Sequence, residues 1–239
     1  MLKSMALQQE LGPLFDITFD CEDGAAIAAA SRSTRNWWRA SSTTKATGST
    51  ASACASTNSP VPTLPLTSLS LLAAGQRLAY IVLPKADSVD DVARAIELIN
   101  KHASKAGRAT PLPVHVLIET HGALRDAHAI RGAACRSNAC RSGSWILCRR
   151  ITARCLTNAM RTPGQFTHPL IVRAKLEMVA ACHAHGKIPS HNVTTEIKDT
   201  AVVANDAAPR PNSASRGCGV STPIRSNRLL KLLHHACQK

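Results

Sequence analysis

The stretch PVHVLIETHGALRD, residues 113–126, joins a buried strand to a carboxylate. The letters VHVLI form a nearly continuous apolar run after two prolines, which is typical of a strand buried on both faces in a parallel sheet. The run stops at Glu119. Open sheets and closed barrels place their chemistry at the carboxyl ends of parallel strands. Glu119 is therefore the first candidate site residue.

A chain of 239 residues is long enough for one large α/β domain with its own core. Its first residues, MLKSMALQQELG, lack the apolar stretch of a secretory signal. No window approaches the roughly 20 apolar residues of a membrane span. We expect a cytoplasmic protein with no membrane partner.

The net charge of +14 is confined to part of the chain. Three windows contain no Asp or Glu at all: residues 25–70, 127–158 and 207–239. These windows hold 16 of the 29 Lys and Arg, which leaves 13 basic against 15 acidic residues elsewhere, a net charge of −2. The windows also hold seven of the nine cysteines, at irregular spacings that do not predict a zinc site. The basic character belongs to the windows alone.

Two further apolar runs end in charged residues. LFDITF (14–19) leads into Glu22 and Asp23, which either belong to a site or form an acidic loop that caps the next helix. AYIVL (79–83) ends at Lys85, about thirty residues before the strand that ends at Glu119, and this spacing is that of one βαβ unit. The two strands should be parallel, so Lys85 and Glu119 should share an edge of the sheet.

Two helices are expected from capping residues and apolar spacing. Ser88 is the predicted N-cap of the first, with Asp91 three residues on, and its apolar stripe is Val92, Ile96 and Ile99. The second starts near Pro169 and ends at Gly186, and its buried side consists of Ile171, Ala174, Met178 and Cys182.

The histidines do not predict a metal site. His183 and His185 are two residues apart and would project from different sides of a helix, so they and His191 are interpreted as helix-end and loop residues. His115, inside a strand, is expected in the core or at its rim. Residues 25–70 read as a disordered linker by composition, although a linker of that length inside a compact domain counts against this interpretation.

The segments FDITFDCEDGA, LAYIVLPKADSVDDV, VHVLIETHGALRD and the stretch from MRTPGQF to VVANDA resemble the HpcH/HpaI aldolase and citrate lyase beta-subunit family. The resemblance covers somewhat more than half of the chain, and LPK and IET together carry it. It implies an α/β fold, the (β/α)8 TIM barrel, incomplete in this chain. It also implies Mg²⁺ as cofactor, an acyl-CoA or small hydroxy-acid substrate, and a homo-oligomer in intact relatives.

By this resemblance, Glu119 is a Mg²⁺ ligand and substrate-binding residue, Glu22 and Asp23 are catalytic, and Lys85 steers an anionic substrate. The ion would polarise the substrate oxygens and stabilise an enolate while a carbon–carbon bond breaks. The alternatives are a carboxylate salt-bridged at the barrel rim for Glu119 and a solvated surface lysine for Lys85.

Three expected pieces of the family are absent: a substrate-binding Arg, a second metal-binding Asp, and a C-terminal segment like WSIHP. Codons for the windows can encode all three when read one nucleotide earlier. The window around residues 33–58 then gives QHAELVASVINDKGNRFDRVGVRVHEF, the window around residues 142–154 gives SFGLMDFVSAHHGAM, and residues 217–232 give RLWSIHPDQIEPIVEA. We interpret the windows as out-of-frame translation and expect them to lack regular structure.

The leading hypothesis is a carbon–carbon lyase of the citrate lyase beta type, impaired in this copy, with a barrel domain over residues 1–208 and an aberrant tail over 209–239. An inactive pseudogene product is compatible with it. The alternative from another class is a basic nucleic-acid-binding protein, which aromatics at 3% of the chain do not favour. We expect no nucleic-acid partner.

Overall fold

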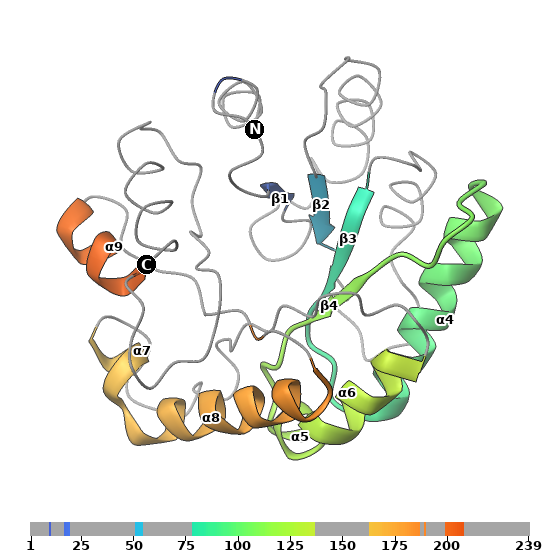
Figure 1. The fold of residues 1–239 in the computed structure, drawn as a ribbon. Helices are drawn as coiled ribbons and strands as arrows, with labels where there is room; N and C mark the ends of the chain where they lie inside the picture. The colour runs from blue at the N-terminus through green and yellow to red at the C-terminus, as the bar shows by residue number, and fades with distance from the viewer. Residues whose placement is uncertain are drawn as a thin grey trace, which may run out of the picture.

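The computed structural model describes residues 10, 17–19, 51–54, 78–136, 163–186, 189 and 199–207. The strands are β1 (Ile17–Phe19), β2 (Ala51–Cys54), β3 (Leu78–Leu83) and β4 (Val114–Val116). The helices are α4 (Val89–Lys105), α5 (His121–Arg125), α6 (Ala127–Arg136), α7 (Gly164–Thr167), α8 (Pro169–Ala184) and α9 (Thr200–Ala207). Figure 1 shows the strands near the middle of the molecule and the helices around them.

The four strands form one sheet in chain order, β1-β2-β3-β4, and each pairs in parallel with its neighbours (Figure 1). Parallel strands in sequential order are the arrangement of successive strands in a (β/α)8 barrel. A register shift interrupts the β2–β3 ladder between its first two pairs, Ala51↔Leu78 and Ala53↔Ile81. The predicted parallel pairing of the strands before Lys85 and Glu119 is confirmed.

Strand β2 lies inside the 25–70 window, where we expected a linker. The expectation is wrong for residues 51–54, which pair with β1 on one side and β3 on the other. Backbone pairing uses N–H and C=O groups that every non-proline residue carries, so the small side chains of ASAC do not prevent it. The rest of this window lies outside the described residues.

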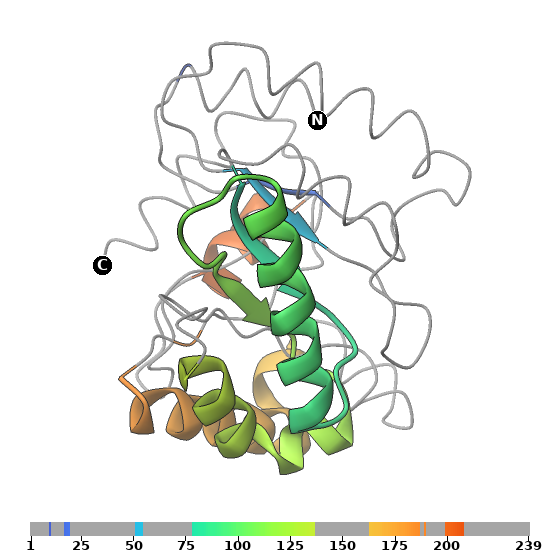
Figure 2. The same ribbon diagram turned by 90° about the vertical axis from the view of Figure 1, so that its right-hand side faces the viewer.

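The two strands with described side chains divide their residues between two faces. Ile81 and Leu83 alternate with Val82 along β3, and all three are buried. Val82 is paired with His115, so these two residues share one face of the sheet. The opposite, aliphatic face carries four residues at 1–2% exposure: Ile81, Leu83, Val114 and Val116. Figure 2 shows α4 running across the sheet. The aliphatic face and the apolar stripe of α4 contribute to one core.

Helix α4 forms as its sequence predicts. The Ser88 hydroxyl accepts from the Asp91 N–H, and the Asp91 carboxylate accepts from the Ser88 N–H in return, which completes a capping box. The predicted stripe of Val92, Ile96 and Ile99 is buried, at 0–3% exposure. These contacts fix the start of α4 directly after the loop that follows β3.

Helix α6 packs against both α4 and α8 (Figures 1 and 2). It occupies residues 127–136, so the expected absence of regular structure is wrong for this part of the second window. Ala127 and Ile130 are buried, and so is Arg131, whose exposure is 1%. A fully buried guanidinium is unusual in a helix interface, because charged groups lose hydration on burial.

Helix α8 also matches its prediction. It starts with Pro169 in the first turn, and Gly186 follows its end with a φ of 61°. The four residues of the predicted stripe, from Ile171 to Cys182, are all buried. Within the described residues, none of the helices has the length and apolar character needed to cross a membrane.

Candidate functional site

The carboxyl ends of β3 and β4 are joined by a contact between Lys85 and Glu119. The backbone N–H of Lys85 donates to Oε1 of Glu119 at 2.6 Å. The Glu119 side chain is buried, at 4% exposure, so its carboxylate is held by the loop after β3 instead of extending into water. The prediction that these two residues share one edge of the sheet is confirmed.

Lys85 presents this N–H from an uncommon backbone conformation. Its φ of 54° is the only positive value among the non-glycine residues that the structure describes. The left-handed region costs about 1–2 kcal/mol for a residue with a Cβ. Such a conformation persists where neighbouring contacts hold it, and here the residue donates its N–H to Glu119.

Thr120 makes a second connection between the same two loops. Its Oγ1 donates to the carbonyl oxygen of Ala86 at 2.9 Å and accepts from the N–H of Ala123 at 3.0 Å. The second bond makes Thr120 the N-cap of α5. One buried hydroxyl therefore fixes both the start of α5 and the loop from which the Lys85 N–H donates to Glu119.

Gly122 makes the third connection through close approach. A Cβ at this position would collide with the backbone oxygen of Asp87 and would lie 2.7 Å from its Oδ1. Only glycine lets the first turn of α5 lie this close to the 84–88 loop. Three successive contacts therefore join the two loops: Lys85 with Glu119, Ala86 with Thr120, and Asp87 with Gly122. We call these three contacts the loop clamp.

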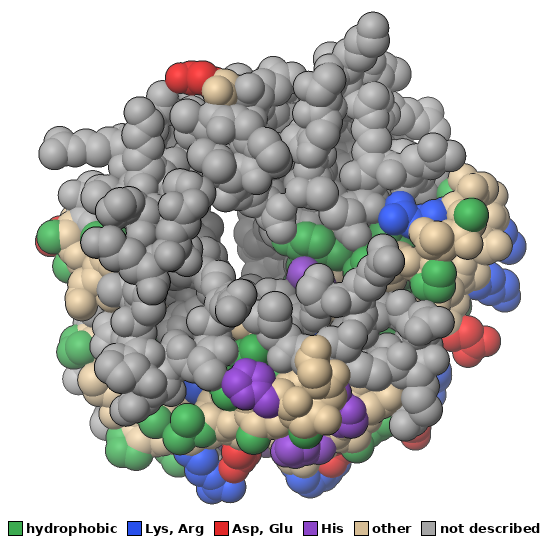
Figure 3. Space-filling view, in the orientation of Figure 1, with side chains coloured by type: hydrophobic (Ala, Val, Ile, Leu, Met, Phe, Trp, Pro, Cys, Tyr) green, Lys and Arg blue, Asp and Glu red, His purple; other side chains and the backbone are tan. Residues whose placement is uncertain are grey.

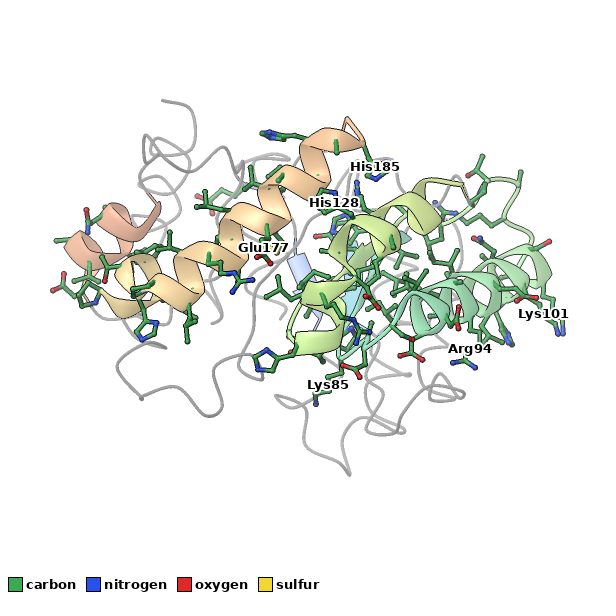
Figure 4. All side chains as sticks on the ribbon, turned by 90° about the horizontal axis from the view of Figure 1, so that it is seen from below. Lys85, Arg94, Lys101, His128, Glu177 and His185 are labelled. Carbon is green, nitrogen blue, oxygen red and sulfur yellow. The ribbon has the colours of Figure 1, made fainter. Side chains whose placement is uncertain are left out.

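The Lys85 side chain is placed differently from its backbone. We predicted that the ammonium group steers an anionic substrate, but the hydrogen bond from Lys85 to Glu119 described above is donated by the backbone N–H. Figure 4 shows the side chain beside α5, directed away from α8. The proximity of Lys85 and Glu119 therefore supports a role for the Lys85 backbone in holding the carboxylate, and the role of its ammonium group stays a prediction.

Tyr80 and His115 lie on the same face of the sheet and stack. Their ring centroids are 3.8 Å apart with an interplanar angle of 16°. His115 is 9% exposed, which confirms the expectation of a core or rim residue. His183 and His185 are exposed at the end of α8, as expected, while His191 lies outside the described residues.

The described residues do not complete a magnesium site. Oxygen ligands suit Mg²⁺, and Glu119 supplies one carboxylate. In the part of the chain that the structure describes, however, no group of three or more His, Cys, Asp or Glu residues could hold a metal ion. Glu22 and Asp23, the other predicted carboxylates, lie outside the described residues. No reaction step through a metal follows from this arrangement.

Apart from the buried Arg131, charged side chains of the described helices gather on the outer surface (Figure 3). Figure 4 shows Arg94 and Lys101 on the side of α4 that faces away from α6. Ion pairs on the described helices include Arg94 with Asp91, Arg125 with Asp126, and Arg173 with Glu177. A hydrogen bond from the Arg125 guanidinium lowers the pKa of Asp126. This mixed pattern differs from the basic stripe of a nucleic-acid interface.

Sequence reasoning missed Thr120 and Gly122. The pattern that identifies Thr120 was present, because a Thr directly before a helical segment is an N-cap signature. The close approach of Gly122 to Asp87 joins positions 35 apart in sequence, and no local pattern encodes it.

A family model for HpcH/HpaI aldolase/citrate lyase matches residues 14–221. The chain belongs to this family. A comparison with curated protein sequences found no match to this chain. The fold is of the TIM-barrel type that the resemblance implied, and the four parallel strands in chain order are part of it.

Solved structures similar to this chain include family members from two bacteria. A citrate lyase from Burkholderia xenovorans LB400 is 36% identical, with a TM-score of 0.80, over 99% of this chain and 72% of that one. The citrate lyase beta subunit of Mycobacterium tuberculosis, complexed with oxaloacetate and magnesium, is 19% identical, with a TM-score of 0.65, over 98% and 94%. The protein CitE of that organism, with magnesium, acetoacetate and coenzyme A, is also 19% identical and has a TM-score of 0.65, over 98% and 78%.

Proposed function

We propose that this chain derives from a magnesium-dependent carbon–carbon lyase that cleaves a β-hydroxyacyl-CoA or a related 3-hydroxy acid, and that the printed chain is impaired. The observation that carries the proposal is the placement of Glu119. A buried carboxylate lies at the carboxyl end of β4, in a fold whose chemistry is located at that edge. The loop clamp holds it there.

Three members of the loop clamp have a role in this proposal: Glu119, Lys85 and Thr120. Glu119 provides a fixed anionic oxygen toward a cation or a hydrogen-bond donor. The Lys85 N–H and Thr120 keep the two loops at one separation, so the carboxylate does not have to be reordered when a substrate binds. A position fixed before binding lowers the entropic cost of assembling a site.

Further support comes from what similar proteins bind. Structures with the same fold contain magnesium together with oxaloacetate, or with acetoacetate and coenzyme A. Both small molecules are β-keto acids, and such acids form an enolate next to a carbonyl. The proposed substrate class, a hydroxy acid or its CoA ester cleaved beside a carbonyl, fits that chemistry, and Mg²⁺ would be the cofactor.

The proposed impairment follows from the residues that are missing. Glu119 is one carboxylate, and the Asp and Arg expected from the family have no counterpart in the printed sequence. Glu22 and Asp23 remain candidates for proton transfer or for holding metal-bound water. The intact family is expected to hold Mg²⁺ with two carboxylates. One of them alone is a weak Mg²⁺ site, so turnover should be low.

The impairment is tested by incubating the purified chain with Mg²⁺ and a panel of β-hydroxyacyl-CoA esters and free 3-hydroxy acids. We expect no cleavage above the rate without protein. Mg²⁺-dependent release of a keto acid or an acyl-CoA would contradict the impairment and would identify the substrate. Binding to DNA that weakens steeply with salt would instead favour the nucleic-acid alternative.

A further inference from the structure

Strand β2 lies where the neighbouring reading frame can encode a strand. Residues 51–54 read ASAC and have none of the residues typical of strands, yet their backbone pairs on both sides. When codons for the same residues are read one nucleotide earlier, codons 52–56 can give VGVRV. This is a strand sequence, rich in β-branched residues, at the position where the sheet has its second strand.

The genetic code limits how much of this match is free choice. In a reading one nucleotide earlier, the second and third bases of each codon are the first two bases of a printed residue. The first base is the third base of the preceding codon, so it varies among synonymous codons. For Ser, Arg and Leu, which have six codons each, the first two bases vary as well, but those of Cys and Ala codons are fixed. Cys54 must therefore become Val, Leu or Met, all of them apolar. Ala55 must become Arg or Cys, since cysteine codons end in C or T.

Tryptophan has a single codon, TGG, so its third base cannot vary and the first base of the following codon in the earlier frame is always G. Trp145 ends in G and Ile146 begins with AT, so the earlier frame reads GAT, aspartate, whichever synonymous codons are used. This is the Asp of SFGLMDF. Asn36, Trp37 and Trp38 force Leu followed by Val in the same way, and these are the letters LV of QHAELVAS. No choice of codons produced these three residues.

The apolar pattern of the second window fails from Arg131 onward, and Arg131 is the fully buried guanidinium of α6. The preceding buried residues of the helix, Ala127 and Ile130, fit an interface with α4 and α8. A helix that packs normally up to Ile130 and then buries a charge is consistent with a change of frame at this point.

We infer that the segments 33–58, from about 131 to 154, and 217–232 are translations, displaced by one nucleotide, of codons that encode barrel residues. Codons 52–54 of strand β2 then encode VGV in place of SAC, and the Arg codon is the next one along the chain. Because β2 is parallel to β3, Cys54 is at the same end of its strand as Leu83, which precedes Lys85 by two residues. Codon 146 supplies an Asp.

The inference is tested by the nucleotide sequence of the gene across these codons. We expect the frame one nucleotide earlier to be free of stop codons in all three segments, and to read VGVRV at codons 52–56 and WSIHP at codons 219–223. The third base of the Cys54 codon should be C, which gives Arg at codon 55. A stop codon within a segment, or a T at that base, would overturn it. This result is independent of any lyase assay.

Discussion

The backbone N–H of Lys85 donates to Oε1 of Glu119 at 2.6 Å, across 34 positions of sequence. This bond joins the ends of two parallel strands and leaves the carboxylate 4% exposed. It also explains why a lysine adopts a φ of 54° in this loop. The candidate site is therefore organised by the backbone of the loop after β3.

Replacing Glu119 separates its acceptor role from its charge. Glu119→Leu leaves the Lys85 N–H without its acceptor, so we expect a loss of about 1–3 kcal/mol in the free energy of unfolding. Glu119→Gln keeps a carbonyl acceptor and should cost less than about 1 kcal/mol. Urea unfolding of both variants measures the difference. Equal losses would mean that the bond to Lys85 does not stabilise the loop.

Thr120 is expected to tolerate serine but not valine. Valine removes both hydrogen bonds of the hydroxyl, to Ala86 and from Ala123, inside a buried site. The expected cost is about 2 kcal/mol, from one lost N-cap and one unsatisfied carbonyl. Thr120→Ser retains the hydroxyl and is the matched control. If serine destabilises the protein as much as valine, the effect arises from packing of the methyl group.

Gly122→Ala should destabilise the loop clamp through collision. The added Cβ meets the backbone oxygen of Asp87, which cannot move without shifting the 84–88 loop. We expect a loss of about 1–3 kcal/mol, as for other overpacked positions. Gly107→Ala is the control, because nothing lies within 4 Å of its Cβ position and only its φ of 83° is unfavourable. A smaller loss at Gly122 than at Gly107 would contradict the close approach.

The capping box of α4 should make stability depend on acid pH. Burial raises the pKa of Asp91, but its hydrogen bonds with Ser88, Asp87 and Arg94 outweigh this and lower the pKa below the ordinary 3.8. Because the folded-state pKa is the lower one, the stabilisation is present above 3.8 and is lost as the pH falls through the folded-state value. Asp91→Asn should lose about 0.5–1 kcal/mol at pH 7. The difference in the free energy of unfolding between this variant and the original chain should shrink below pH 3.8. A difference that stays constant with pH would contradict this.

The sequence predicted those parts of the fold that depend on local patterns. The capping box at Ser88, the stripe of α4, the buried face of α8 and the shared edge of Lys85 and Glu119 all follow from spacing and strand order. Strand β2 was missed because ASAC has no strand propensity and its pairing comes from the neighbouring strands. The contact between Gly122 and Asp87 was missed because it arises only when two loops meet.

The most direct test of the account uses the chain with its three segments translated one nucleotide earlier, assayed for Mg²⁺-dependent cleavage of β-hydroxyacyl-CoA esters. We expect this restored chain to release keto acid or acyl-CoA. Its Glu119→Gln variant and the printed chain should both have much lower activity, because each lacks one of the two carboxylates proposed to bind Mg²⁺. A restored chain that folds but cleaves none of these esters, or a Glu119→Gln variant as active as its parent, would contradict the account.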